Sequence, residues 1–325
     1  MQKVLVDLLQ SDSQLSVIGT ARDGEEALSK IKSLRPDVVT LDIEMPRMNG
    51  LTTVRKIMAT NPLPVVMISA LAQREAQLTL KALEFGAVDY VPKPSGPISL
   101  NMGDVKTELI SKVKTAASAN IRQVTPLKAE KLAPPKAKSR DKIISIAAST
   151  GGPAAVSYIL RNIPANTPPI LVVQHMQKGM TKLFSEGLNQ ECKIQVKEAE
   201  EGDVVQEGLA LIAPGGFHMI VTSEGEINLT TAPPVNYVRP SADVLMKSAA
   251  KNFEAKNIGV VLTGMGVDGA RGVEAIKKNG GVTIAQNKKT CVVFGMPRAA
   301  INTGCVDFVT PLESIPKEIM AACED

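Results

Sequence analysis

The chain has 325 residues, 44% of them hydrophobic, which exceeds the usual domain size of about 100 to 200 residues and predicts two domains. The net charge is only +4 and 3% of the residues are aromatic, so the composition argues against a nucleic-acid-binding platform. Four cysteines without a CxxC pair and only two histidines indicate neither a disulfide framework nor a zinc site, and no stretch is apolar enough for a secretion signal or a membrane span. We therefore expect a cytoplasmic protein without membrane insertion.

The first third of the chain alternates short β-branched runs with amphipathic stretches, which is typical of an α/β sheet covered by helices on both faces. The expected strands cover 38–41, 64–68 and 89–91. The expected helices cover 25–34, 51–59, 75–84 and 105–118. From 119 to 140 the periodicity stops and three prolines lie among Lys, Ala and Ser, which indicates an extended linker. The pattern predicts a first domain over 1–118, the linker over 119–140, and a second domain over 141–325.

The second domain contains continuous apolar runs at 143–148, 170–173 and 258–262, as expected for strands buried on both faces of a parallel sheet. Each run is followed by a polar loop and a helical pattern. Residues 193–230 alternate differently and carry glycines at turn positions, so we expect an antiparallel insertion or sheet edge there. The fold class is a doubly wound parallel α/β sheet with an antiparallel insertion.

Three chemically reactive side chains follow these apolar runs. Ser149 ends the first run and leads into Gly151-Gly152-Pro153, His175 follows the second run, and Asp268 follows the third within a glycine-rich loop. Since reactive residues of parallel sheets gather where strands end, we expect a nucleophile, a base and an orienting acid in one crevice. Glycines flank Met265, whose backbone N–H is a plausible oxyanion donor.

The members of this triad also have structural interpretations or rivals in the sequence, and His175 alone is more often a loop histidine with satisfied hydrogen bonds than a base. A serine before a helix is more often a cap than a nucleophile. His218 is the other histidine, and its place before a strand favours packing or substrate contact. Asp243 and Asp203 compete with Asp268, although the first opens a helical pattern and the second falls in a turn. The coincidence of three strand ends favours the triad.

Four segments around these residues resemble the chemotaxis protein-glutamate methylesterases, the CheB family. They are ASTGG at 148–152, QHM at 174–176, RPSAD at 239–243 and LTGMGVDG at 262–269. The resemblance runs from about residue 142 to the C-terminus. It implies hydrolysis of glutamyl methyl esters, and deamidation of specific glutamines, on the cytoplasmic helices of chemotaxis receptors. It also implies a triad of Ser149, His175 and Asp268, with Met265 lending a backbone donor and no metal or cofactor in catalysis.

The first third resembles the flavodoxin-like receiver domain of response regulators in two-component signalling. Asp42, in Leu41-Asp42-Ile43-Glu44-Met45-Pro46, resembles the phospho-acceptor aspartate, which implies phosphorylation by a chemotaxis histidine kinase. The resemblance further implies that Lys93 pairs with the phosphoryl group and that Ser69 and Tyr90 respond to it.

The N-terminus departs from the receiver pattern. Receivers begin with a strand that ends in an acidic pair holding Mg²⁺, and the sequence has no such pair. Val4, Leu5, Leu8 and Leu9 instead mark one helical face, and 17–20 follows closely and resembles the second receiver strand. We therefore expect a truncated receiver that starts within its first helix, lacks its first strand, and has no acidic pair for the Mg²⁺ on which phosphorylation relies in the family.

These observations favour a receiver-regulated methylesterase. The alternative is a signalling adaptor whose hydrolase-like domain is catalytically dead, and the intact triad argues against it. A DNA-binding output is disfavoured because no helix-turn-helix with a basic recognition helix is evident.

Overall fold

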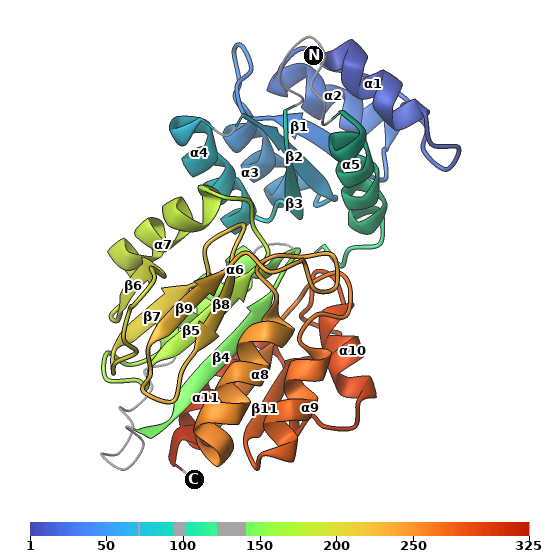
Figure 1. Cartoon of the computed structure of the whole chain (residues 1–325). Coiled ribbons are helices and arrows are strands. Elements are labelled where there is room, and N and C mark those ends of the chain that lie inside the picture. The colour runs from blue at the N-terminus through green and yellow to red at the C-terminus, as the bar shows by residue number, and fades with distance from the viewer. Residues whose placement is uncertain (71, 94–101, 122–140, 325) are drawn as a thin grey trace. The chain divides into compact units, whose positions relative to one another are not determined.

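The computed structural model describes residues 1–70, 72–93, 102–121 and 141–324 (Figure 1). By its internal contacts the chain divides into two units, Met1–Thr125 and Pro126–Asp325. Most of the expected linker, from residue 122 onward, lies outside the described residues. The domain limits inferred from the sequence remain predictions, and each unit is described by itself.

The first unit is a parallel α/β sheet. Its strands, in the spatial order β1-β2-β3, are β1 (Val39–Asp42), β2 (Val65–Ser69) and β3 (Asp89–Pro92). Its helices are α1 (Gln2–Gln10), α2 (Gly24–Leu34), α3 (Gly50–Thr60), α4 (Gln73–Glu84) and α5 (Met102–Ala117). The central strand β2 is buried along its whole length because it has a neighbour on each side. The strands and the helices α2 to α5 lie within three residues of their predicted limits.

The N-terminal segment is helical, as its apolar pattern predicts, and α1 packs against α5. Lys114 on α5 forms an ion pair with Asp12 at 2.7 Å. The strand expected over 17–20 is not formed, so this expectation is wrong. Its backbone would need a neighbouring strand to satisfy its N–H and C=O groups, and none of the three strands described in this unit pairs with it.

The second unit is built on a seven-stranded parallel sheet, ordered β12-β11-β10-β4-β5-β7-β6. Its strands are β4 (Ile143–Ala148), β5 (Ile170–Gln174), β6 (Gln195–Glu198), β7 (Leu209–Ile212), β10 (Asn257–Val261), β11 (Val282–Gln286) and β12 (Phe308–Thr310). The helices are α6 (Gly152–Asn162), α7 (Met180–Glu191), α8 (Ala242–Phe253), α9 (Ala270–Lys278), α10 (Met296–Asn302) and α11 (Ile315–Glu324), with 3₁₀ turns at Glu254–Lys256 and Leu312–Ser314.

The core of this unit lies between the sheet and the helices that follow its strands. Ile143 and Ala147 of β4 pack with Leu245, Met246 and other buried apolar side chains of α8 and α9, which lie across one face of the sheet in Figure 1. Every residue of the three central strands β10, β4 and β5 is buried. This burial explains their continuous apolar runs and confirms the predicted parallel α/β class.

The region from 193 to 230 is antiparallel only in its second half. Strands β6 and β7 extend the main sheet in parallel, and only β8 (His218–Val221) and β9 (Ile227–Thr230) form an antiparallel hairpin, which packs on α8. The expected antiparallel insertion is therefore limited to β8 and β9, whereas β6 forms the expected sheet edge and pairs in parallel with β7. Only β6 is partly exposed, because it is the edge strand of the sheet, whereas β7 lies inside the sheet and is fully buried.

Candidate active site

The pairing of β4 with β5 places Ser149 next to His175. Ala148 and Gln174 are register partners at the carboxyl ends of these parallel strands, so the residues that follow them, Ser149 and His175, lie at the same edge of the sheet. The backbone N–H of His175 donates to the carbonyl of Ala148 at 3.0 Å. The amide of Gln174 donates to the carbonyls of Ser149 at 3.0 Å and of His175 at 3.2 Å. These bonds hold the two strand ends together.

Strand β10 brings the third loop to the other side of Ser149. The backbone N–H of Ser149 donates to the carbonyl of Thr263 at 3.1 Å, directly after β10. A Cβ atom on Gly264 would lie 2.7 Å from the Cβ of Ser149, so only glycine allows the loop to pass so close. Met265, the expected backbone donor, is the next residue in this loop and has a half-exposed side chain.

Ser149 also lies at the N-terminus of α6. Its carbonyl accepts from the N–H of Gly152 at 2.7 Å, and Pro153 occupies the first turn of the helix. Gly151 has a φ of +74°, a conformation that glycine adopts without cost. The positive end of the helix dipole and nearby N–H groups therefore favour negative charge on the serine oxygen or on a carbonyl that it attacks.

His175 is paired with Asp268. Its Nε2 lies 2.9 Å from Oδ2 of Asp268, and the side chains are 12% and 3% exposed. Because Nε2 faces the carboxylate, Nδ1 is the ring nitrogen left to take a proton from a nucleophile. Among the described residues, the Ser149 hydroxyl makes no hydrogen bond to His175 or to any other group. Such bonds commonly tighten only when substrate is bound.

Asp268 accepts hydrogen bonds from several donors besides His175. Its Oδ1 accepts from Ser241 Oγ at 2.7 Å and from Asn236 Nδ2 at 2.9 Å, and its Oδ2 accepts from the N–H of Ala242 at 2.6 Å, at the start of α8. Burial opposes ionisation, but the hydrogen bonds from His175, Ser241 and Asn236 prevail and lower the pKa of Asp268 from 3.8 to about 2. The carboxylate is therefore charged at neutral pH.

The low pKa of Asp268 predicts a pH dependence of stability. Its folded-state pKa lies below the unfolded one, so the stabilisation is complete above about pH 4 and is lost as the pH falls through about 2. A difference of this size corresponds to about 2 kcal/mol. Denaturant titrations of the wild-type chain and Asp268→Asn should give unfolding free energies that converge as the pH falls from about 5 to about 2. A gap that stays constant would contradict this prediction.

The competing residues have structural roles. Nδ1 of His218 accepts from the N–H of Ser241 at 3.1 Å, and its Nε2 donates to the carbonyl of Pro233 at 3.1 Å, so both ring nitrogens are occupied in a fully buried site. Asp203 forms an ion pair with Lys197 at 2.9 Å. Asp243 lies in the first turn of α8 and accepts from the N–H groups of Gly269 and Gly272, at 2.9 and 2.8 Å.

The helices α8 and α9 thus cap each other's N-termini beside the triad. Asp268, which precedes α9, accepts from N–H groups at the start of α8, and Asp243, in the first turn of α8, accepts from N–H groups at the start of α9. Asn236 joins the two carboxylates, since its single amide nitrogen donates to Asp243 Oδ2 and to Asp268 Oδ1, both at 2.9 Å. The sequence pattern did not indicate these roles of Asn236 and Ser241. Ser241 falls within the family-like segment 239–243, which is the signal that could have singled it out.

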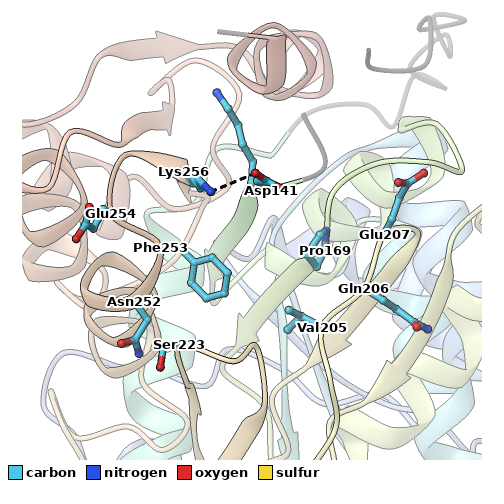
Figure 2. Close-up of a pocket in the computed structure, with 11 residues that line it drawn as sticks. Asp141, Pro169, Val205, Gln206, Glu207, Ser223, Asn252, Phe253, Glu254 and Lys256 are labelled. Atoms are coloured by element: carbon cyan, nitrogen blue, oxygen red, sulfur yellow. Dashed lines mark hydrogen bonds and ion pairs between the residues drawn. The ribbon is translucent and has the colours of Figure 1, made fainter. Parts of the chain in front are cut away.

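A hollow lies at the ends of the strands opposite to the triad (Figure 2). Its volume is about 500 Å³, and its lining includes Asp141, Pro169, Glu207 and Lys256, which stand just before β4, β5, β7 and β10. Asp141 and Lys256 form an ion pair there at 3.2 Å, drawn as a dashed line. None of the reactive residues inferred from the sequence lines this hollow, because all of them follow strands rather than precede them.

In the first unit, the three strand ends bring the expected receiver residues together. The Nζ of Lys93 lies 2.8 Å from Oδ1 of Asp42 and 3.2 Å from Oε2 of Glu75. Partial burial lowers the pKa of Lys93, but its hydrogen bonds to Asp42 and Glu75 outweigh this effect and raise it overall. The ammonium is therefore held next to the position where a phosphoryl group on Asp42 would lie.

Ser69 and Tyr90 occupy buried positions near this pair. The Ser69 hydroxyl donates to the carbonyl of Ala70 at 2.9 Å and accepts from Thr79 at 2.7 Å. The backbone of Ser69 accepts from the N–H of Lys93 at 2.8 Å. Tyr90 is 3% exposed, on β3. A response of Ser69 or Tyr90 to phosphorylation remains a prediction.

The residues around Asp42 do not fit the Mg²⁺ ion that receivers use. This ion prefers nearly octahedral oxygen coordination, whereas Asp42 and its carboxylate neighbour Glu75 are both paired with Lys93. Within the described ranges, no group of three or more His, Cys, Asp or Glu side chains is placed to hold a metal ion.

We expect the 325-residue chain to bind Mg²⁺ weakly. Acetyl phosphate should therefore phosphorylate Asp42 slowly, and millimolar Mg²⁺ should change the rate little. Intact mass measured over time, with Asp42→Asn as the control, would check this. A steep Mg²⁺ dependence in the wild-type chain would contradict the lack of fit.

The two parallel sheets, one with a Lys93–Asp42 pair and one with a His175–Asp268 pair at its strand ends, define a receiver domain joined to an α/β output domain of hydrolase type. Residues 144–319 match the model of the CheB methylesterase family, and residues 1–102 match that of the response regulator receiver domain. The chain belongs to the CheB methylesterase family. No helix among the described residues is long and apolar enough to cross a membrane.

Relatives with assigned names are similar to this chain over nearly its whole length. The protein-glutamate methylesterase/protein-glutamine glutaminase of Pyrococcus abyssi is 51% identical over 100% of this chain and 91% of its own length. The protein of the same name from Geobacillus kaustophilus is 46% identical over 98% of this chain and 95% of its own. The crystal structure of the Thermotoga maritima CheB methylesterase catalytic domain matches 55% of this chain and 97% of that one, with 42% identity and a TM-score of 0.54.

Proposed function

We propose that this chain hydrolyses glutamyl methyl esters, and deamidates specific glutamines, on the cytoplasmic helices of chemotaxis receptors. The observation that carries the proposal is the His175–Asp268 pair at 2.9 Å, on strand ends that adjoin Ser149. Family membership and the names of the relatives supply the substrate class. No residue in the proposed mechanism needs a metal or a cofactor.

In the first half of the reaction, Ser149 Oγ attacks the glutamyl carbonyl while Nδ1 of His175 takes the hydroxyl proton. The imidazolium that forms is stabilised by Asp268, which the pKa of about 2 keeps ionised. The carbonyl oxygen becomes an oxyanion, for which the N–H of Met265 and the N-terminus of α6 are the proposed donors. When the tetrahedral intermediate collapses, His175 returns the proton to the departing methoxide.

The second half of the reaction repeats these steps with water. His175 takes a proton from the water molecule, the resulting hydroxide attacks the glutamyl-serine ester, and Ser149 leaves with the proton restored. The products are methanol and a glutamate side chain. A glutamine enters by the same route and releases ammonia, so a single triad serves both reactions.

We further propose that phosphorylation of Asp42 by a chemotaxis histidine kinase regulates the esterase. The ion pair of Asp42 with Lys93 supports this assignment, because the ammonium lies where it would neutralise an incoming phosphoryl group. A cytoplasmic location follows from the proposed receptor helices and kinase as partners.

The direct experiment is methanol release from methylated receptor membranes by the full chain. We expect release that depends on enzyme concentration, together with conversion of receptor glutamines to glutamates in mass spectra. If the chain is instead an adaptor with a dead hydrolase-like domain, it will release no methanol and will resist labelling by a serine-directed fluorophosphonate.

A further inference from the structure

Three exposed apolar side chains lie on the two loops that meet at Asp268. Tyr237, Met265 and Val267 are 101%, 49% and 55% exposed, and they are among the few large apolar side chains that the described residues leave so open to solvent. Met265 and Val267 belong to the loop that carries Asp268. Tyr237 follows Asn236, whose amide donates to Asp268 at 2.9 Å. All three therefore lie on the two loops that position the acid of the triad.

Tyr237 occupies a backbone position that favours glycine. Val235 and Val238 exchange backbone hydrogen bonds at 3.1 and 3.0 Å, so Asn236 and Tyr237 form a two-residue hairpin turn. Both turn residues have positive φ, +53° and +65°, which is the type I′ pattern that usually carries Asn-Gly. A bulky side chain is disfavoured there because its Cβ crowds the backbone.

Folding stability does not explain a tyrosine at this position. Its ring is fully exposed, so no apolar burial in the folded chain offsets the unfavourable backbone conformation. Strained residues of this kind concentrate at functional sites, where the surrounding structure holds them in place. Here the surrounding structure is the amide of Asn236, anchored to Asp243 and Asp268. The turn is thereby attached to the triad, and the tyrosine is presented at a set position beside it.

We infer that Tyr237, Met265 and Val267 form an apolar contact surface for the polypeptide segment that carries the esterified glutamate. The inference rests on the proposed function, because a polypeptide whose side chain reacts at Ser149 comes next to the loop that runs from Thr263 to Asp268 and carries Met265 and Val267. A helical substrate presents residues three and four positions away from the glutamate on the same face. Apolar residues at those positions would pack on this surface, and the uncharged methyl ester would lie at its edge. Tyrosine suits the role because it provides a large, rigid contact area at low entropic cost.

The test compares Tyr237→Gly and Val267→Ser with the control Val204→Ser. Val204 is 59% exposed and next to Val205, which lines the hollow at the opposite ends of the strands, so the control removes an equally exposed valine far from the triad. For methylated receptor membranes, Tyr237→Gly should raise KM roughly tenfold and leave kcat within about twofold, because it removes ground-state contact but no reacting group. Its melting temperature should not fall, since glycine fits the turn. Val267→Ser should raise KM less, and Val204→Ser should leave it unchanged.

An unchanged KM in Tyr237→Gly, or an equal rise in Val204→Ser, would overturn the inference. A loss of kcat together with a lower melting temperature would also overturn it, because the tyrosine would then support the fold of the loop. Failure of the proposed function has a different signature, since the wild-type chain would release no methanol. In that case, co-sedimentation of the Ser149→Ala chain with receptor membranes, with and without Tyr237→Gly, still decides whether the surface binds receptor helices.

Discussion

Replacing Ser149 with alanine is expected to lower the rate of methanol release by a factor on the order of 10⁴ to 10⁶, because the hydroxyl is the proposed attacking atom and no other nucleophile takes its place. The fold should not change, since the side chain is only partly buried and its hydroxyl makes no hydrogen bond among the described residues. Initial rates on methylated receptor membranes, with circular dichroism and thermal unfolding in parallel, measure both effects.

The matched control for this variant is Ser145→Ala. Ser145 is buried on β4, the strand that precedes Ser149, and its hydroxyl donates to Asn257 at 3.2 Å, away from the strand end. Its loss should cost about 1 kcal/mol of stability and leave the rate within about twofold. If purified Ser149→Ala kept more than half of the activity, the triad assignment would be wrong.

The second large effect is expected for Asp268→Asn, which should lower kcat by roughly 10⁴. The asparagine has one acceptor oxygen, whereas both oxygens of Asp268 accept hydrogen bonds, so its NH₂ group must face donors in either orientation. If the NH₂ group faces His175, it forces the tautomer that carries its proton on Nδ1, which then cannot take a proton from Ser149. Stability should also fall by about 3 kcal/mol, because buried donors lose their partner.

Asp243→Asn is the control that separates rate from stability. Asp243 is equally buried and caps α9 as Asp268 caps α8, but it does not touch His175. We expect a comparable loss of stability by denaturant titration and a much smaller loss of rate, within about tenfold, transmitted through Asn236. Equal rate losses in the two variants would mean that Asp268 acts only as a helix cap.

The sequence predicts the fold class and the strand ends well because both depend on local pattern. The runs that became β4, β5 and β10 are buried on both faces, and continuous apolar runs are the direct signature of such strands. Once the sheet is parallel, the residue that follows each strand must lie at the same edge. The sequence pattern alone therefore groups Ser149, His175 and Asp268.

Pairing between distant segments could not be read from the sequence in the same way. The segment 17–20 has a strand-like composition but no neighbouring strand in the structure, and composition alone does not reveal a missing partner. Strand β6 alternates as an antiparallel edge strand would, yet it pairs in parallel with β7. Strand orientation depends on the path of the connecting chain, which the burial pattern does not record.

The sequence by itself determined which residues of this protein can do chemistry, because nucleophile, base and acid are properties of side-chain type and strand ends are local features. Only the tertiary structure decided how these residues are held. Asn236 and Ser241 reach Asp268 across 32 and 27 positions of the chain, and two helices exchange caps through Asp243 and Asp268. Such hydrogen bonds form between groups that only folding brings together, so no local sequence pattern predicts them. They set the low pKa of the acid and the place of Tyr237 beside it.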